Sequence, residues 1–492
     1  MNDPIPVIDL FAGPGGLGEG FEAFPSNLGG FKIVASVECN AWAHRTLELR
    51  SFFRQFPKGK SPNEYYQYLH GEISRDVVFN RYPKQAEMAA QIARLGRLGD
   101  ESSTPAATVD EWIQAGLGPK RKRGPWLLIG GPPCQAYSLV GRARRTKEAR
   151  ETFEKDERHF LYREYLRILE KHRPSVFVME NVKGILSAKH GEKQIFGRIC
   201  DDLSGAGYEL HGLSGVPVRD SAGNWIPDSF VIRAEEHGIP QKRHRVFIIG
   251  VQRDCGVVPR HLPHQAAEIS VKQALCGLPK LWSSISRRGR GSADWVSARD
   301  RGMNLAGWTS NRGTNSPVHG SGGNFVPHAN VPDFERDWFY DPKLGGSVNH
   351  EARTHMAEDI SRYAFAAAFA KHNGRSPAIQ EFPRTLTPAH RNLDDPAGII
   401  PFADRFRVQI ADRPASTVTC HISKDGHYYI HPDPLQARSF TVREAARIQT
   451  FPDNYFFEGP RTEQYKQVGN AVPPLLAKMI AGVVFNLLNQ MG

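Results

Sequence analysis

A single cysteine in a glycine- and proline-rich segment is the residue of this chain best suited to covalent chemistry. Cys134 ends the run Gly130-Gly131-Pro132-Pro133-Cys134 and follows Trp126-Leu127-Leu128-Ile129, an apolar run of strand length. Two prolines with fixed φ hold the cysteine on a stiff loop, a geometry that suits a thiolate attacking a substrate at a sheet edge. A buried, unreactive thiol beside a turn is the alternative, because free cysteines are usually small buried hydrophobes.

A glycine-rich turn near the N-terminus predicts a ligand pocket. The segment leaves an apolar strand at 5–11 and enters a helix, and it carries Gly13, Gly15 and Gly18, while Glu38 ends the next strand at 31–38. Glycines let the backbone approach a ligand, and an acidic side chain on the second strand accepts hydrogen bonds from ribose hydroxyls. The pattern fits either NAD or S-adenosylmethionine, and a tight turn without a ligand is a further alternative.

Three more segments carry polar groups that could support chemistry: Met179-Glu180-Asn181-Val182, Gln241-Lys242-Arg243-His244-Arg245 and Gln467-Val468-Gly469-Asn470-Ala471-Val472-Pro473-Pro474. Glu180 ends a buried strand at 175–179, where a carboxyl group could act on a bound ligand. Arg243 and Arg245 supply planar donor forks and fixed positive charge. Taken singly, each segment is as readily a surface feature.

In this order, the five segments resemble the cytosine-5 DNA methyltransferases of bacterial modification systems. The resemblance covers residues 5–50, 126–250 and 405–490, is weak over 51–125 and is absent over about 255–400. It implies an α/β fold with a doubly wound, Rossmann-like S-adenosylmethionine-dependent methyltransferase sheet and a smaller, irregular target-recognition domain.

The resemblance also implies roles for individual residues. The residues that would bind S-adenosylmethionine are Phe11, Gly13, Gly15, Gly16, Glu38, Pro133, Gly469 and Asn470. Glu38 would bind the ribose, and the segment of Gly469 and Asn470 would close the pocket. Asp100 is a candidate for the acidic contact to the adenine amino group.

Cytosine chemistry explains why such residues are needed. Carbon 5 of cytosine is a poor nucleophile until a thiolate adds to carbon 6, and Cys134 is the candidate thiolate. Glu180 would hydrogen-bond ring nitrogen 3, and Arg243 and Arg245 would bind the base carbonyl or a phosphate. The base must be flipped out of the duplex, and residues 141–160 resemble the family's mobile loop over flipped DNA.

Composition is consistent with a DNA-binding enzyme. The chain has 492 residues, a net charge of +11 and a pI of about 9.3, a balance that favours a polyanionic partner. Basic residues crowd at 120–123, 142–150 and 287–301, which would suit phosphate contacts. The six cysteines show no paired spacing, so we expect reduced thiols and neither a disulfide framework nor a metal site. We expect no metal cofactor, no membrane segment and a cytoplasmic, nucleoid-associated bacterial protein.

Alternating strands and helices predict a parallel, doubly wound sheet, with a helix at 161–171 and a strand at 245–250. We expect a catalytic domain at 1–255, a target-recognition domain at 256–430 and a return to the catalytic domain at 431–492. A hairpin is expected where 417–424 and 427–431 flank Asp425-Gly426. A capping box should open a helix at Thr441, and Pro473-Pro474 should start a last helix over 475–489.

The sequence therefore predicts transfer of a methyl group from S-adenosylmethionine to carbon 5 of cytosine in double-stranded DNA. The resemblance implies a monomer on DNA and a restriction-modification system, whose restriction endonuclease is not physically bound. A tRNA or RNA cytosine-5 methyltransferase and a catalytically silent DNA-binding protein are the alternatives. An NAD dehydrogenase would explain only the glycines.

Overall fold

The large lobe is a sheet whose strands carry apolar side chains on both faces. The computed structural model describes residues 3–25, 29–119, 124–133, 158–190, 193–286, 295–308, 319–388 and 404–491. The strand order is β3-β2-β1-β4-β5-β11-β8, and β9 also pairs with β11. The strands are β1 (Ile5–Leu10), β2 (Phe31–Glu38), β3 (Ala93–Leu95), β4 (Leu127–Gly130), β5 (Val176–Val182), β8 (Tyr208–His211), β9 (Val231–Arg233) and β11 (His244–Gln252).

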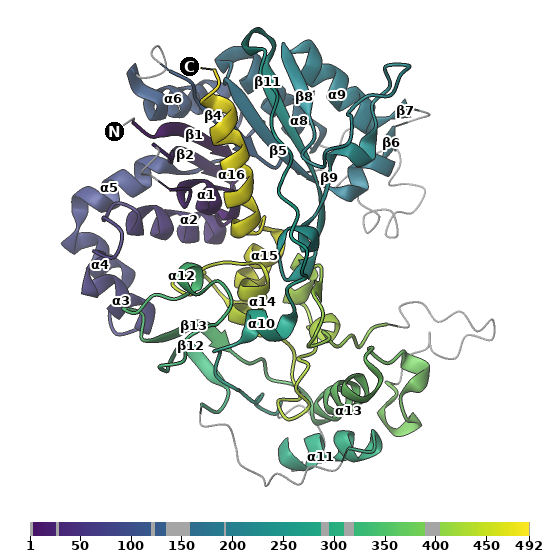
Figure 1. Cartoon of the computed structure of the whole chain (residues 1–492). Coiled ribbons are helices and arrows are strands. Elements are labelled where there is room, and N and C mark those ends of the chain that lie inside the picture. The colour runs from purple at the N-terminus through teal and green to yellow at the C-terminus, as the bar shows by residue number, and fades with distance from the viewer. Residues whose placement is uncertain are drawn as a thin grey trace.

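Alternation along the strands sends side chains into two separate cores. Val7 and Leu127 join the core under α1 (Gly16–Glu22) and α16 (Pro474–Leu488). Ile8 and Leu128 join the core under α6 (Ala106–Leu117), α8 (Arg158–His172) and α9 (Ile195–Gly205). Because successive side chains in a strand point to opposite faces, helices cover both faces (Figure 1), as in a doubly wound fold.

One strand departs from the all-parallel prediction. The strands β3, β2, β1, β4 and β5 are mutually parallel, but β11 pairs antiparallel with both β5 and β8. A parallel pairing needs a long crossover, usually a helix, and β11 is preceded only by short elements. The sheet is therefore mixed, and the antiparallel register sets Phe247 opposite Glu180.

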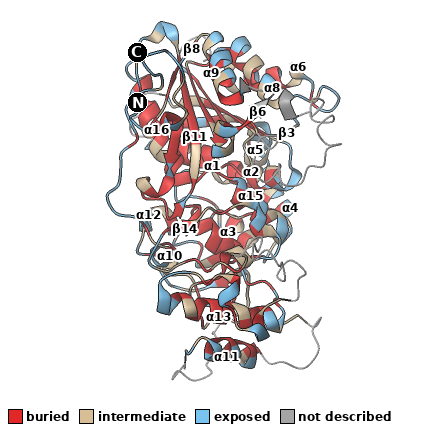
Figure 2. Ribbon diagram, turned by 90° about the vertical axis from the view of Figure 1, so that its right-hand side faces the viewer, coloured by how far each residue is buried: buried red, intermediate tan, exposed pale blue. Residues whose placement is uncertain are grey.

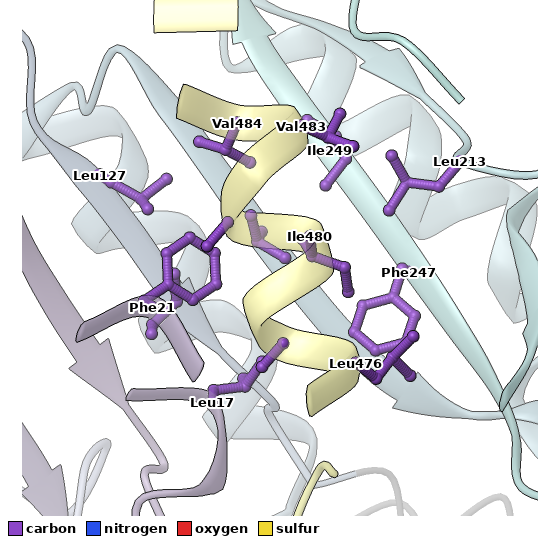
Figure 3. Packing of buried hydrophobic residues seen from close by; sticks show 14 of the residues in the cluster. Leu17, Phe21, Leu127, Leu213, Phe247, Ile249, Leu476, Ile480, Val483 and Val484 are labelled. Atoms are coloured by element: carbon purple, nitrogen blue, oxygen red, sulfur yellow. The ribbon is translucent and has the colours of Figure 1, made fainter. Parts of the chain in front are cut away.

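The C-terminal helix closes the first core. It starts at Pro474, a residue favoured at the first helical position, and Leu476, Ile480 and Val484 point toward the sheet (Figure 3). The segment Arg461–Leu488 is long and apolar enough to cross a membrane, but 72% of its apolar window is buried inside the protein. Packing on the sheet therefore accounts for its composition.

The small lobe, by which we mean residues 271–448, lies below the sheet in Figure 1. Its elements are α10 (Val271–Leu275), α11 (Trp295–Leu305), β12 (Gly322–Pro327), α12 (Arg336–Phe339), β13 (Gly346–Glu351), α13 (Ala357–Asn373), β14 (Ala415–Ser416) and α14 (Val442–Ile448). The lobe has a buried interior of its own (Figure 2). The predicted capping box of Thr441 and Glu444 is confirmed at α14.

Four helices connect β2 to β3. They are α2 (Ala41–Phe53), α3 (Asn63–His70), α4 (Arg75–Arg81) and α5 (Pro83–Ile92). Leu49, Phe52 and Tyr65 share one apolar cluster with Leu344 and Val348 of the small lobe. The helix α15 (Arg461–Asn470) joins another cluster with α14. The chain therefore returns to the sheet at α16, whereas residues just beyond 431 pack with the small lobe.

The predicted hairpin around Asp425-Gly426 is wrong. Gly426 does take a turn conformation with φ 78°, but the flanking residues do not pair with each other. Ile430 bridges Val408 and Ser439, while Val418 donates its N–H to the Gln241 side chain. Long-range partners thus take the backbone groups that the hairpin would have used.

Candidate active site at the carboxyl edge of the sheet

The glycine-rich turn leaves β1 in a conformation that few residues adopt. Phe11, Gly13 and Gly15 have φ values of 57°, 58° and 94°, the left-handed region that is costly for residues with a side chain. The N–H of Gly13 donates to Glu38 Oε2 at 2.7 Å, and the N–H of Asn40 donates to Glu38 Oε1 at 2.7 Å. Glu38 therefore holds the turn against the end of β2.

Gly16 and Gly13 have different surroundings. A Cβ at Gly16 would lie 2.3 Å from the carbonyl oxygen of Val472, so this glycine lets the C-terminal segment approach the turn. A Cβ at Gly13 would meet nothing within 4 Å. Open space beside Gly13, at the end of β1, is where a bound ligand could lie against the backbone.

The C-terminal segment predicted to close the pocket reaches the turn at Ala471 and Val472, since a Cβ at Gly16 would lie 3.2 Å from the Cβ of Ala471. Gly469 is buried, and a Cβ there would lie 2.3 Å from the backbone nitrogen of Cys420. Asn470, the last residue of α15, is exposed. Close packing explains why residue 469 is glycine.

The second half of the edge brings together the segments of β4, β5 and β11. Arg245 Nε lies 3.1 Å from Glu180 Oε1, and the two side chains are 13% and 14% exposed. A Cβ at Gly131 would lie 3.1 Å from Glu180 Oε2, and Asn181 Nδ2 donates to the Pro132 carbonyl at 3.0 Å. Glu180 is therefore held between an arginine and the loop that leads into Pro133.

Cys134 lies outside the described residues. Of the predicted loop at 141–160, residues 141–157 also lie outside them, and α8 begins at Arg158. Pro133 is the last described residue before the cysteine. Because β4 lies between β1 and β5, the loop that enters Cys134 leaves the sheet between the glycine-rich turn and Glu180.

Arg243 lies in a different environment from Arg245. It is 1% exposed and donates to the Val418 carbonyl at 2.7 Å and to the Gly469 carbonyl at 3.4 Å. Burial lowers the pKa of Arg243, and the charge of Arg245 lowers it further. Burial also lowers the pKa of Arg245, but Glu180 opposes that effect. The guanidinium of Arg243 therefore bonds backbone carbonyls, and through Gly469 it links the segment at the start of β11 to α15.

Asp100 lies on the loop that follows β3, and its carboxylate accepts hydrogen bonds from Ser102 and Ser103. These bonds lower the pKa of Asp100 to about 2. In the described part of the chain, no three His, Cys, Asp or Glu residues are grouped to hold a metal ion.

The basic runs are only partly described. Arg299 is buried and pairs with Asp300, and Arg301 donates to the Thr385 carbonyl. Residues 120–123, 142–150 and 287–290 lie outside the described residues. The predicted phosphate contacts of these runs stay predictions.

Sequence reasoning missed two residues that lie at the glycine-rich turn. Asp9 is 1% exposed, and neither of its carboxylate oxygens hydrogen-bonds to a described residue. Burial raises the pKa of Asp9 to about 8, although the charge of Arg54 opposes the effect. Tyr455, 441 positions from Pro14, donates its hydroxyl to the Pro14 carbonyl. Asp9 is an acid within the apolar strand at 5–11, a signal that could have found it, whereas Tyr455 carries no local signal.

Comparison with known proteins gives a consistent result. Residues 124–486 match the family of C-5 cytosine-specific DNA methylases. The chain is 37% identical to the type II methyltransferase M.Bpa9945I of Bacillus paralicheniformis, over 98% of this chain and 99% of that protein. It is 25% identical to the type II methyltransferase M.AgeI of Thalassovita gelatinovora, over 97% and 98% of the two chains.

A solved structure from E. coli, described as a DNA modification methyltransferase encoded within a prophage, has the same fold. Its TM-score is 0.51 at 20% identity, and the match covers 99% of both chains. The predicted fold class is confirmed.

The chain belongs to the C-5 cytosine-specific DNA methylase family. It is a DNA (cytosine-5)-methyltransferase, and the family implies S-adenosylmethionine as the methyl donor and DNA as the substrate.

Proposed function

We propose that this enzyme methylates cytosine within one specific duplex DNA sequence, through a transient bond between the Cys134 sulfur and carbon 6 of a flipped-out base. The observation that supports this most directly is the Glu180–Arg245 pair, which lies beside Gly131 on the loop that enters Cys134. An acid and a cation are groups that addition of a thiolate to a cytosine ring requires, and the loop that they contact leads in the sequence to Cys134.

The proposed reaction begins when the Cys134 thiolate forms a bond to carbon 6. The electron pair of the 5,6 double bond moves toward carbon 5 and the ring, and a hydrogen bond from the Glu180 carboxyl to nitrogen 3 stabilises the developing charge. S-adenosylmethionine, when bound, supplies the methyl group that carbon 5 accepts. Water then takes the carbon-5 proton, the electron pair of that carbon–hydrogen bond re-forms the 5,6 double bond, and the bond between carbon 6 and sulfur breaks to release the Cys134 thiolate.

Arg245 and Arg243 have separate proposed roles. Arg245 orients Glu180 through the 3.1 Å contact and presents its fork to the base carbonyl or a phosphate. Arg243, whose guanidinium already bonds the carbonyls of Val418 and Gly469, is a positioning residue that fixes α15 beside the site.

The glycine-rich edge fits S-adenosylmethionine. The space beside Gly13 leaves room for a ligand against the backbone, and the Glu38 carboxylate lies at the same point. Glu38 would accept hydrogen bonds from the ribose and Phe11 would contact the cofactor. The other residues proposed to hold it are Gly15, Gly16, Pro133, Gly469 and Asn470.

We further propose that residues 256–430 read the DNA sequence and that duplex DNA binds between the lobes. The enzyme would act as a monomer in the bacterial cytoplasm. Its likeness to type II methyltransferases supports a role in a restriction-modification system, with a restriction endonuclease that is not physically bound.

Bisulfite sequencing of DNA from cells that express the chain tests the proposal. We expect protected cytosines at one recurring sequence and none in cells that express Cys134→Ser. Bisulfite sequencing of RNA from the same cells tests the alternative substrate. Protected cytosines in tRNA but not in DNA would contradict the proposed substrate.

A further inference from the structure

Tyr455 connects the small-lobe side of the molecule to the turn that would hold the cofactor. The residue follows α14, is 1% exposed, and packs against Phe451 and Phe457 with ring centroids 4.8 and 5.4 Å away. Its hydroxyl leaves this apolar cluster and donates to the carbonyl of Pro14, which is buried. The contact fixes one point of a turn otherwise rich in glycine.

The backbone of Tyr455 is itself fixed to the small lobe. Arg443, which is fully buried, donates to the carbonyls of Tyr455 and Pro452 and to the carbonyl of Val348 in β13. Because β13 belongs to the small lobe, Arg443 ties the backbone of Tyr455 to that lobe.

A second connection runs along the other side of the ring. The Arg50 guanidinium lies 4.8 Å from the Tyr455 ring centroid, and it donates to Glu19 of α1 at 2.9 and 2.5 Å. Arg50 also donates to Asn454 at 3.0 Å, and Asn454 donates to Asp341 of the small lobe at 2.7 Å. The start of α1 is thus joined to the small lobe through both the hydroxyl and Arg50.

The hydroxyl of Tyr455 also lies close to Gly15. A Cβ at Gly15 would lie 3.0 Å from the Tyr455 hydroxyl oxygen and 2.8 Å from Leu47 Cδ1. The hydroxyl is therefore packed against the turn at Gly15 as well as bonded to the Pro14 carbonyl.

We propose that Tyr455 is a positioning residue for the cofactor: its hydroxyl holds the Pro14 carbonyl, and so keeps the turn at residues 12–16 in the conformation that binds S-adenosylmethionine. This inference rests on the proposed location of the cofactor pocket. Without the hydroxyl, the Pro14 carbonyl loses a partner that buried surroundings cannot replace. A glycine-rich turn freed in this way spends part of its time in other conformations, and the apparent dissociation constant rises in proportion to the lost fraction.

The test is Tyr455→Phe in the full-length enzyme, with Tyr208→Phe as a matched control. Tyr208 is also a buried tyrosine whose hydroxyl donates to a proline carbonyl, that of Pro174 at 2.9 Å, but it lies on β8 at the edge of the sheet. Calorimetry should show a dissociation constant for S-adenosylmethionine raised ~3- to 10-fold by Tyr455→Phe and unchanged by Tyr208→Phe. In steady state, KM for S-adenosylmethionine should rise by the same factor, with kcat changed less than about twofold.

Comparison of three variants separates the outcomes. Equal affinities for Tyr455→Phe and Tyr208→Phe, with a weakened Glu38→Ala, would overturn the role of Tyr455 and leave the pocket in place. Unchanged affinity in all three would contradict the pocket itself. If Tyr455→Phe fails to fold, Asn454→Ser is measured in its place. This variant keeps the Tyr455 hydroxyl but removes the Arg50–Asn454–Asp341 connection. We expect that variant to weaken cofactor binding as well, and unchanged affinity would count against the proposal.

Discussion

Glu38 offers the sharpest test of the cofactor pocket. Its carboxylate bonds backbone N–H groups, which affects stability, and is proposed to bond the ribose, which affects affinity, so two different measurements separate these roles. In the structure it accepts 2.7 Å hydrogen bonds from the N–H groups of Gly13 and Asn40. In the proposed complex it also accepts hydrogen bonds from the ribose. The first two bonds exist with or without the cofactor, so their loss affects stability, whereas the ribose contact affects binding.

The expected magnitudes follow from the bonds lost. Hydrogen bonds to a charged group contribute about 1.5–3 kcal/mol each, and partial exposure of this carboxylate favours the lower end. Glu38→Gln keeps one acceptor oxygen but turns an amide N–H toward a backbone N–H, so we expect a stability loss of ~1–2 kcal/mol. Glu38→Ala removes both acceptors and the ribose contact, and cofactor affinity should fall by about 1–3 kcal/mol, or ~5- to 150-fold.

Calorimetric titration with S-adenosylmethionine and thermal unfolding measure the two effects. Glu22→Gln is the control, because Glu22 also accepts a backbone N–H, that of Ile33 at 2.8 Å, but it lies at the far end of α1. We expect it to lower stability without changing affinity. Affinity within twofold of wild type for Glu38→Ala would refute the placement of the ribose at Glu38.

Four other expectations can be checked. Cys134→Ser should abolish methyl transfer and leave DNA binding largely intact, and DNA with 5-fluorocytosine should trap a Cys134 adduct visible by mass spectrometry; a near wild-type rate would contradict the mechanism. Arg245→Lys should lower kcat by ~10²-fold because it replaces the fork that orients Glu180, and an unchanged kcat in a methyl-transfer assay would argue against that role. Burial raises the pKa of Asp9 from 3.8 to about 8, so between these values the unfolded chain ionises while the folded chain stays protonated. Unfolding free energy should then fall by at most about 1.4 kcal/mol per pH unit, and Asp9→Asn should flatten the dependence in urea titrations at pH 5 and 8. Exchanging residues 255–400 for those of a relative with another target should move methylation to the relative's site in bisulfite sequencing, and an active enzyme that keeps its own site would contradict the division between lobes.

The local sequence determined the components of the site. Glu38 ends β2 and Gly13 lies on the turn after β1, so the predicted strands at 5–11 and 31–38 already placed both residues at strand ends. That β1 lies beside β2, and β4 beside β5, came from the tertiary structure. Strand ends have local signatures, whereas the order of the strands in the sheet does not.

Long-range packing decided the rest. Nothing local marks Tyr455 as the partner of Pro14, or Arg243 as the donor to Val418 and Gly469. The hairpin failed for the same reason, because distant partners such as Gln241 took the backbone groups near Val418. Most buried donors and acceptors are hydrogen-bonded, and their partners are those that the fold brings within reach. The sequence therefore determined which chemistry the chain carries, and only the tertiary structure decided which side chains hold that chemistry in place.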